Sequence, residues 1–134
     1  MRSYGVLDGE REGPDIVDEI YPEAGDLIVE KYGYNAFHHT RLAEALRANG
    51  VIDLVVTGTV TQICVEDTVH GAFHEGYRTV VVSDAVSSYD EELHRATLRN
   101  IELKYGRCCR PRRSWPIWPG PREPAARKGM GWRT

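Results

Sequence analysis

The chain has 134 residues and a formal net charge of −3, a length that suits one ordinary domain whose core closes only if most of the chain contributes to it. No apolar run approaches the roughly 20 residues of a membrane span, and the polar opening lacks the apolar core of a signal peptide, so we expect no membrane association and a cytoplasmic location. The three cysteines form neither a disulfide frame nor a CxxC metal spacing, which predicts that Cys64 is a free thiol.

The first expected elements are a strand, a helix and a second strand. Residues 26–31 place an apolar triplet between polar ends, which suits a short buried strand closed by Lys31. Residues 40–50 carry leucines and alanines on one helical face and stop at Asn-Gly, a normal helix end. The apolar run at 51–57 predicts the next strand.

The alternation of expected strands and helices continues after the turn at Gly58. Apolar residues recur at helical spacing from Val65 to Gly76, and residues 78–84 form another continuous apolar strand. Residues 88–91 resemble a capping box that opens a helix ending at Gly106. Alternating strands and helices predict an α/β fold, with a parallel sheet covered by helices in three αβα layers.

The net charge changes sign between the main part of the sequence and its C-terminal segment. Residues 107–134 hold eight Lys/Arg against one acid, giving +7, whereas residues 1–106 hold nine against nineteen, giving −10. The basic segment also carries all three tryptophans and five of the seven prolines. A nucleic-acid-binding arm is conceivable from this composition. We favour a disordered tail, or a reading frame in the wrong phase, and expect no nucleic-acid partner.

Cys64 is the strongest candidate for chemistry. It follows a strand and a tight turn and falls at a helix start, where unpaired N–H groups favour the thiolate. Lys31, residues 58–64 and Asp84 all lie just past expected strand ends, where parallel sheets bind ligands. Backbone N–H groups of Val60 and Cys64 could stabilise an oxyanion. The plain alternative is a buried core cysteine and a solvated lysine.

A family resemblance is carried by the segment at 58–68, which reads Gly-Thr-Val-Thr-Gln-Ile-Cys-Val-Glu-Asp-Thr. Together with residues 22–37 and 84–106 it resembles the isochorismatase-like cysteine hydrolases, over residues 13–106. The resemblance implies that Cys64 attacks a carbonyl carbon, that Lys31 supports the charges, and that water releases an acyl-enzyme. It also implies an oxyanion hole at the N–H groups of Val60 and Cys64, a cis Thr59–Val60 peptide, and no cofactor.

Two departures from the family pattern lie at the ends of the match. The family's catalytic aspartate sits on a first strand of Asp-x-Gln type, which this sequence lacks. In the family's sheet order 3-2-1-4-5-6, residues 27–29 would form strand three, and strands one and two are missing. The sixth strand is expected to be replaced by residues 107–110 and the basic tail. We therefore expect a partial domain at 1–106 and a separate tail at 107–134.

Other polar residues are given structural interpretations. Asp84 is expected to serve its turn, and Glu66 and Asp67 to oppose the dipole of the helix after Cys64. His70 and His74 are spaced i, i+4 but lack further ligands, so no metal site is predicted. Nicotinamidase-type members of the family carry an Asp/His metal cluster that this sequence does not show, which disfavours a nicotinamidase.

Two functions remain open from the sequence. One is a hydrolase that cleaves an amide or carbamoyl C–N bond of a small molecule, with the full domain forming a homo-oligomer as the resemblance implies. The other is a non-catalytic remnant that lacks the aspartate strand and acts at most as a binding module.

Overall fold

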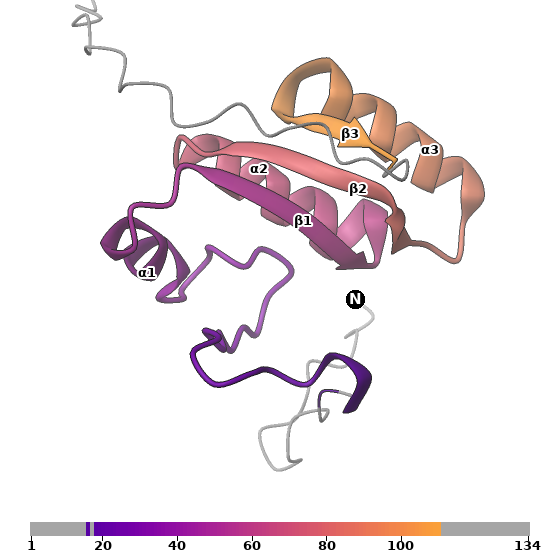
Figure 1. Ribbon diagram of the computed structural model, residues 1–134. Helices are drawn as coiled ribbons and strands as arrows, with labels where there is room; N and C mark the ends of the chain where they lie inside the picture. The colour runs from indigo at the N-terminus through magenta and orange to yellow at the C-terminus, as the bar shows by residue number, and fades with distance from the viewer. Residues whose placement is uncertain (1–15, 17, 111–134) are drawn as a thin grey trace, which may run out of the picture.

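The computed structural model describes residue 16 and residues 18–110. Three parallel strands and three α-helices alternate along this part of the chain (Figure 1). In chain order the elements are the 3-10 turn η1 (Asp18–Ile20), α1 (Leu42–Ala48), β1 (Asp53–Thr59), the π-helical turn η2 (Thr61–Val65), α2 (Glu66–His74), β2 (Arg78–Ser87), α3 (Glu91–Asn100), the π-helical turn η3 (Ile101–Tyr105) and β3 (Arg107–Cys109).

The strands lie in the order β1-β2-β3, and both pairings are parallel. Val56 of β1, Val81 of β2 and Cys108 of β3 are in register across the sheet. The register shifts between Val56 and Gly58, so that β2 bulges and the two strands end together with Thr59 beside Ser87. The carboxyl ends of β1 and β2 therefore meet at one edge of the sheet.

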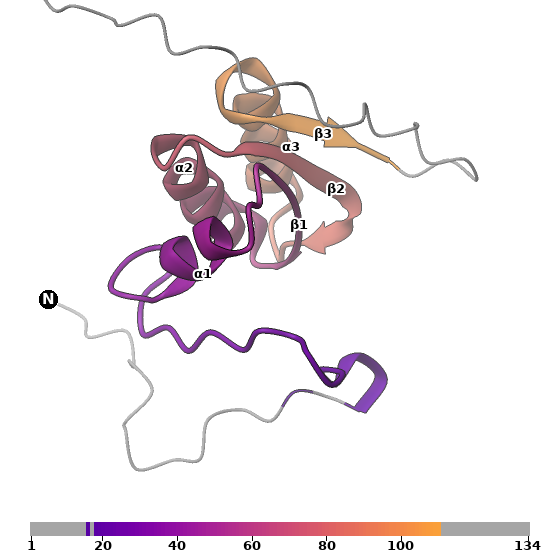
Figure 2. The same ribbon diagram turned by 60° about the vertical axis from the view of Figure 1, so that its left-hand side comes forward.

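Helices α2 and α3 cover the same face of the sheet (Figures 1 and 2). The core lies between this face and the two helices, where apolar residues become inaccessible to solvent. Its buried members are Val65, Val69, Val81, Val86 and Ile101, with Val56, Leu98, Tyr105 and Cys108 packed against them. The predicted fold class of a parallel sheet with covering helices is confirmed, and the described helices α2 and α3 supply one of its two helical layers.

Most expected elements match the structure. The helix at 40–50 and the strands at 51–57 and 78–84 correspond to α1, β1 and β2. The capping-box prediction is wrong by two residues, because Asp90, not Ser88, caps α3 by accepting from the Leu93 N–H at 2.9 Å. Ser88 accepts instead from the Asp90 N–H and shapes the approach to the helix.

The strand predicted at 26–31 does not form. This segment has no strand beside it among the described residues, and Leu27 and Ile28 are 60% and 62% exposed. An apolar triplet becomes a strand only when a neighbour supplies hydrogen-bond partners.

The expectation that no sixth strand follows Gly106 is also wrong. Residues Arg107–Cys109 form β3, which pairs with β2 at Val80, Val81 and Val82. Arg107 and the two cysteines are too short a segment to indicate a strand by themselves, but β2 presents an edge at which β3 can bond.

Residues 111–134, which include Trp115, Trp118 and Trp132, lie outside the described residues, so the predicted disordered tail stays a prediction. Within the described residues, no helix has the length and apolar content needed to cross a membrane.

Candidate active site

The turn that carries Cys64 connects the end of β1 to α2. The Thr59–Val60 peptide is cis, at the position that the resemblance implies. Val60 is extended, and its carbonyl oxygen accepts from the N–H groups of Ile63 at 3.1 Å and Val65 at 3.3 Å. Cys64 is half-buried in η2, the first turn of the helical segment that continues into α2. The turn that carries this thiol directly follows the carboxyl end of β1.

Thr61 holds the start of this turn. Its side chain is completely buried, and its Oγ1 donates to the Ser87 carbonyl oxygen at the end of β2, at 3.0 Å. His94 Nδ1 lies 2.9 Å from the same Oγ1. Because the single hydroxyl proton is used on Ser87, Nδ1 must donate to Thr61, which fixes the ring with a proton on Nδ1. His94 is thus a half-buried residue of α3 with a specific polar partner in the Cys64 turn.

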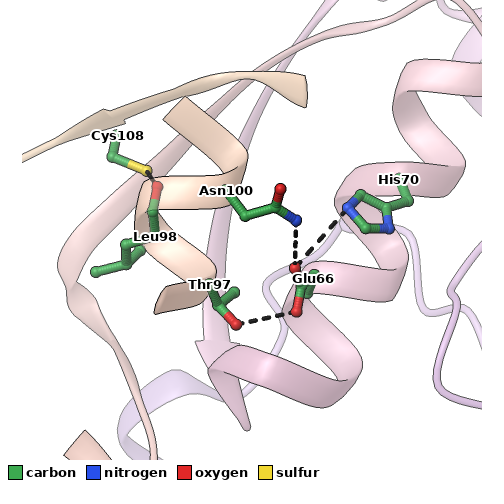
Figure 3. A network of polar contacts seen from close by, with 6 residues as sticks. All are labelled: Glu66, His70, Thr97, Leu98, Asn100 and Cys108. Carbon is green, nitrogen blue, oxygen red and sulfur yellow. Dashed lines mark hydrogen bonds and ion pairs between the residues drawn. The ribbon is translucent and has the colours of Figure 1, made fainter. Parts of the chain in front are cut away.

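Glu66 holds the end of the same turn (Figure 3). One carboxylate oxygen accepts from the Thr97 hydroxyl at 2.9 Å and the other from the Asn100 amide at 2.8 Å. His70 Nε2 lies 4.0 Å from the second oxygen. Both donors belong to α3, so Glu66 links α2 to α3 besides lying in the first turn of its helix.

Gln62 lies inside the turn with its side-chain nitrogen and oxygen both buried, and neither has a hydrogen-bond partner among the described residues. Buried polar atoms without partners cost about 1–3 kcal/mol. The turn therefore contains, two residues from Cys64, a buried side-chain amide without hydrogen bonds in the described residues.

Lys31 is not joined to Cys64 by any hydrogen bond or ion pair in the described part of the chain. Its side chain is exposed, and its Nζ donates to the Gly33 carbonyl oxygen at 2.9 Å. Asp84 is exposed in the bulged part of β2, three residues before that strand ends, and the expectation that it serves a turn after the strand is wrong. The sequence thus predicted the position of the thiol, but the structure does not bring its expected partner to it.

No three His, Cys, Asp or Glu side chains gather as a metal site within residues 18–110. A cavity of about 640 Å³ lies between residues 27–30 and α1, away from the Cys64 turn. Its walls include Leu27, Ile28, Ala45 and Ala48.

Comparison with known proteins places this geometry in a family. Residues 2–111 match the isochorismatase domain. The chain belongs to the isochorismatase family. It is 45% identical over 92 residues to ureidoacrylate amidohydrolase RutB of Methylobacterium radiotolerans, covering 68% of this chain and 36% of the relative. It is 39% identical over 102 residues to nicotinamidase 3 of Arabidopsis thaliana, covering 75% of this chain and 51% of the relative.

Solved structures of the isochorismatase family share the fold. The N-carbamoylsarcosine amidase from Thermoplasma acidophilum superposes with a TM-score of 0.67 at 35% identity, covering 75% of this chain and 57% of that one. The chain thus spans about a third to a half of the length of the two curated relatives described above. One of these relatives is a nicotinamidase, an enzyme type that the sequence disfavoured because it shows no Asp/His metal cluster.

Sequence reasoning missed the polar contacts that hold the Cys64 turn. Glu66 was assigned to the helix dipole, and Thr97 and Asn100 received no role. The available signal was weak: in the sequence, Thr97 and Asn100 flank the apolar residues Leu98 of α3 and Ile101 of η3. Only the packing of α3 against η2 and the hydrogen bonds from α3 to Glu66 of α2 show what these side chains contact.

Proposed function

We propose that this chain carries the nucleophile of a cysteine-dependent hydrolase that cleaves an amide or carbamoyl C–N bond of a small molecule. The observation that carries the proposal is the place of Cys64, in the turn after β1 of an isochorismatase-family sheet. The names of the relatives support the bond type, because they describe an amidohydrolase, a nicotinamidase and a carbamoylsarcosine amidase.

In this proposal the Cys64 thiolate attacks the carbonyl carbon, and the carbonyl oxygen becomes an oxyanion. The N–H groups of Val60 and Cys64 stabilise that oxyanion. Collapse of the intermediate expels the amine, which takes up a proton, and leaves an acyl group on Cys64. Water then attacks the acyl-enzyme and releases the acid, which restores the thiol. Lys31 supports the negative charge if its segment moves from the position where its Nζ donates to Gly33.

A second candidate is a non-catalytic remnant that acts at most as a binding module. The observation that favours it is the exposed side chain of Lys31, which forms no hydrogen bond or ion pair with Cys64 in the described residues. A thiol without a proton donor for the leaving amine would be a poor catalyst of C–N cleavage.

Ammonia or amine release from a panel of small amides and ureido compounds separates the two candidates. The hydrolase predicts turnover that Cys64→Ala abolishes, with a mass increase on Cys64 when a slow substrate traps the acyl-enzyme. Cys109→Ala is the matched control, because Cys109 is another half-buried cysteine but lies in β3. Cooperative unfolding without turnover, or turnover that persists in Cys64→Ala, would refute the hydrolase proposal.

The assembly and location of the protein remain proposals as well. We propose a homo-oligomer in the cytoplasm whose partner is a small-molecule substrate, with no nucleic-acid or membrane partner. Light scattering at several protein concentrations measures the assembly, and salt-dependent retention on single-stranded DNA would contradict the absence of a nucleic-acid partner.

A further inference from the structure

The turn that carries Cys64 is fixed at both ends by side chains of one helix, α3. Thr61 at its start contacts His94, and Glu66 just after its end contacts Thr97 and Asn100. We propose that Glu66 is a positioning residue, whose carboxylate sets the orientation of the Cys64 turn by binding α3. The proposal rests on the proposed role of Cys64 as nucleophile.

The contacts of Glu66 suit this role because they use both carboxylate oxygens (Figure 3). Thr97 is only 4% exposed, so its hydroxyl has little access to water and depends on Glu66. Hydrogen bonds to an ionised acceptor are stronger than neutral ones, and two from separate donors restrict rotation of the carboxylate. Glu66 lies two residues after Cys64, so restricting Glu66 also restricts the turn.

Comparison with Asp67 indicates that a negative charge in the first turn of α2 is not enough for the positioning role proposed for Glu66. Both residues lie in the first turn of α2, where an acid opposes the helix dipole. The Asp67 side chain is exposed, whereas the Glu66 carboxylate is bound to α3. Substitutions of Glu66 and Asp67 therefore separate two effects on Cys64: that of a nearby negative charge and that of the contact with α3.

The donors on α3 form one side of that helix. His94, Thr97 and Asn100 follow one another at intervals of three residues, which places them on neighbouring positions of the helix surface. Thr61 is tied in addition to Ser87 at the end of β2. Loss of the Glu66 contacts would thus leave the turn tied to α3 at its start but no longer at its end, and we expect the resulting shift to change how its N–H groups face the Cys64 sulfur.

Alkylation of Cys64 by iodoacetamide tests the proposal without requiring turnover. The rate is measured from about pH 7 to about pH 10.5 in the full chain, a range that spans the ordinary pKa of a cysteine thiol. Peptide mass mapping separates Cys64 from Cys108, whose pKa is raised to about 11 by burial, by the charges of Glu102 and Cys109, and by a hydrogen bond with Glu102. The pH of half-maximal rate reports how well the turn stabilises the thiolate, and the plateau reports access to the sulfur.

Glu66→Asp keeps the charge but withdraws the carboxylate from α3. We expect its half-maximal pH to rise by about half a unit, which is roughly a threefold slower alkylation near pH 7. Asn100→Ala removes one exposed donor, is expected to fold, and should shift the profile in the same direction by a smaller amount. The control Asp67→Asn removes a negative charge without touching α3, and its half-maximal pH should stay constant or fall.

The signs of these shifts decide the outcome. A rise in both Glu66→Asp and Asn100→Ala, with none in Asp67→Asn, supports the positioning role. A faster plateau with an unchanged half-maximal pH would mean that Glu66 only stabilises the fold, and would overturn the proposal. So would equal shifts in all three variants. Failure of the hydrolase proposal would appear separately, as absent turnover in the unmodified chain.

Discussion

Gly106 separates η3 from β3, and replacing it with alanine tests whether β3 belongs to the sheet. Its φ of −175° is extended backbone that any residue adopts, so alanine introduces no backbone strain there. A Cβ at this position would lie 2.2 Å from the Thr79 Oγ1 and 2.8 Å from the Thr79 carbonyl oxygen. The effect of the substitution therefore comes from contact alone.

Thr79 cannot move aside easily. It is 2% exposed in β2, and its Oγ1 donates to the Tyr105 carbonyl oxygen at 3.0 Å. Overpacking of this kind costs about 1–3 kcal/mol, and loss of the hydroxyl hydrogen bond adds about 1 kcal/mol. We expect Gly106→Ala to lower the free energy of unfolding by about 2–4 kcal/mol.

Urea unfolding followed by far-UV circular dichroism measures this change. Gly33→Ala is the matched control, because no atom lies within 4 Å of a Cβ built there, and it should change stability by less than about 0.5 kcal/mol. Adding Thr79→Ala to Gly106→Ala should restore only part of the loss, because the Thr79 carbonyl oxygen remains in place. Equal stability of Gly106→Ala and the unmodified chain would refute the packing of β3 beside β2.

Two further predictions concern stability. Gln62→Met removes the two buried unpaired atoms, so it should raise the free energy of unfolding by about 1 kcal/mol in the same urea assay, and a loss would contradict the burial of that amide. Burial of Cys108, with the charge of Glu102, raises its pKa from 9.0 to about 11. A raised pKa in the folded state contributes stability below the unfolded value, which is lost as pH rises from about 9 to about 11. Partial exposure limits this contribution to roughly 1 kcal/mol. Cys108→Ala should therefore reduce by that amount the loss in the free energy of unfolding between about pH 9 and about pH 11. An unchanged dependence of that free energy on pH would contradict the prediction.

The local signals in the sequence determined much of the sheet and its helices. Continuous apolar runs predicted β1 and β2, and helical spacing predicted α1, α2 and α3. The same local pattern placed Cys64 in the turn between β1 and α2. These predictions succeed because each depends on residues that are adjacent or a few positions apart in the chain.

Tertiary structure decided the features that depend on a distant partner. Residues 26–31 have the composition of a strand but form no strand pairing in the described residues, whereas the short segment Arg107–Cys109 becomes β3 because β2 offers it an edge. From the sequence, Glu66 is interpreted as an acid that opposes the helix dipole. The structure shows that it accepts a hydrogen bond from Thr97 of α3, 31 positions along the chain. A strand or a polar contact is defined by two partners, and a single stretch of sequence carries only one of them.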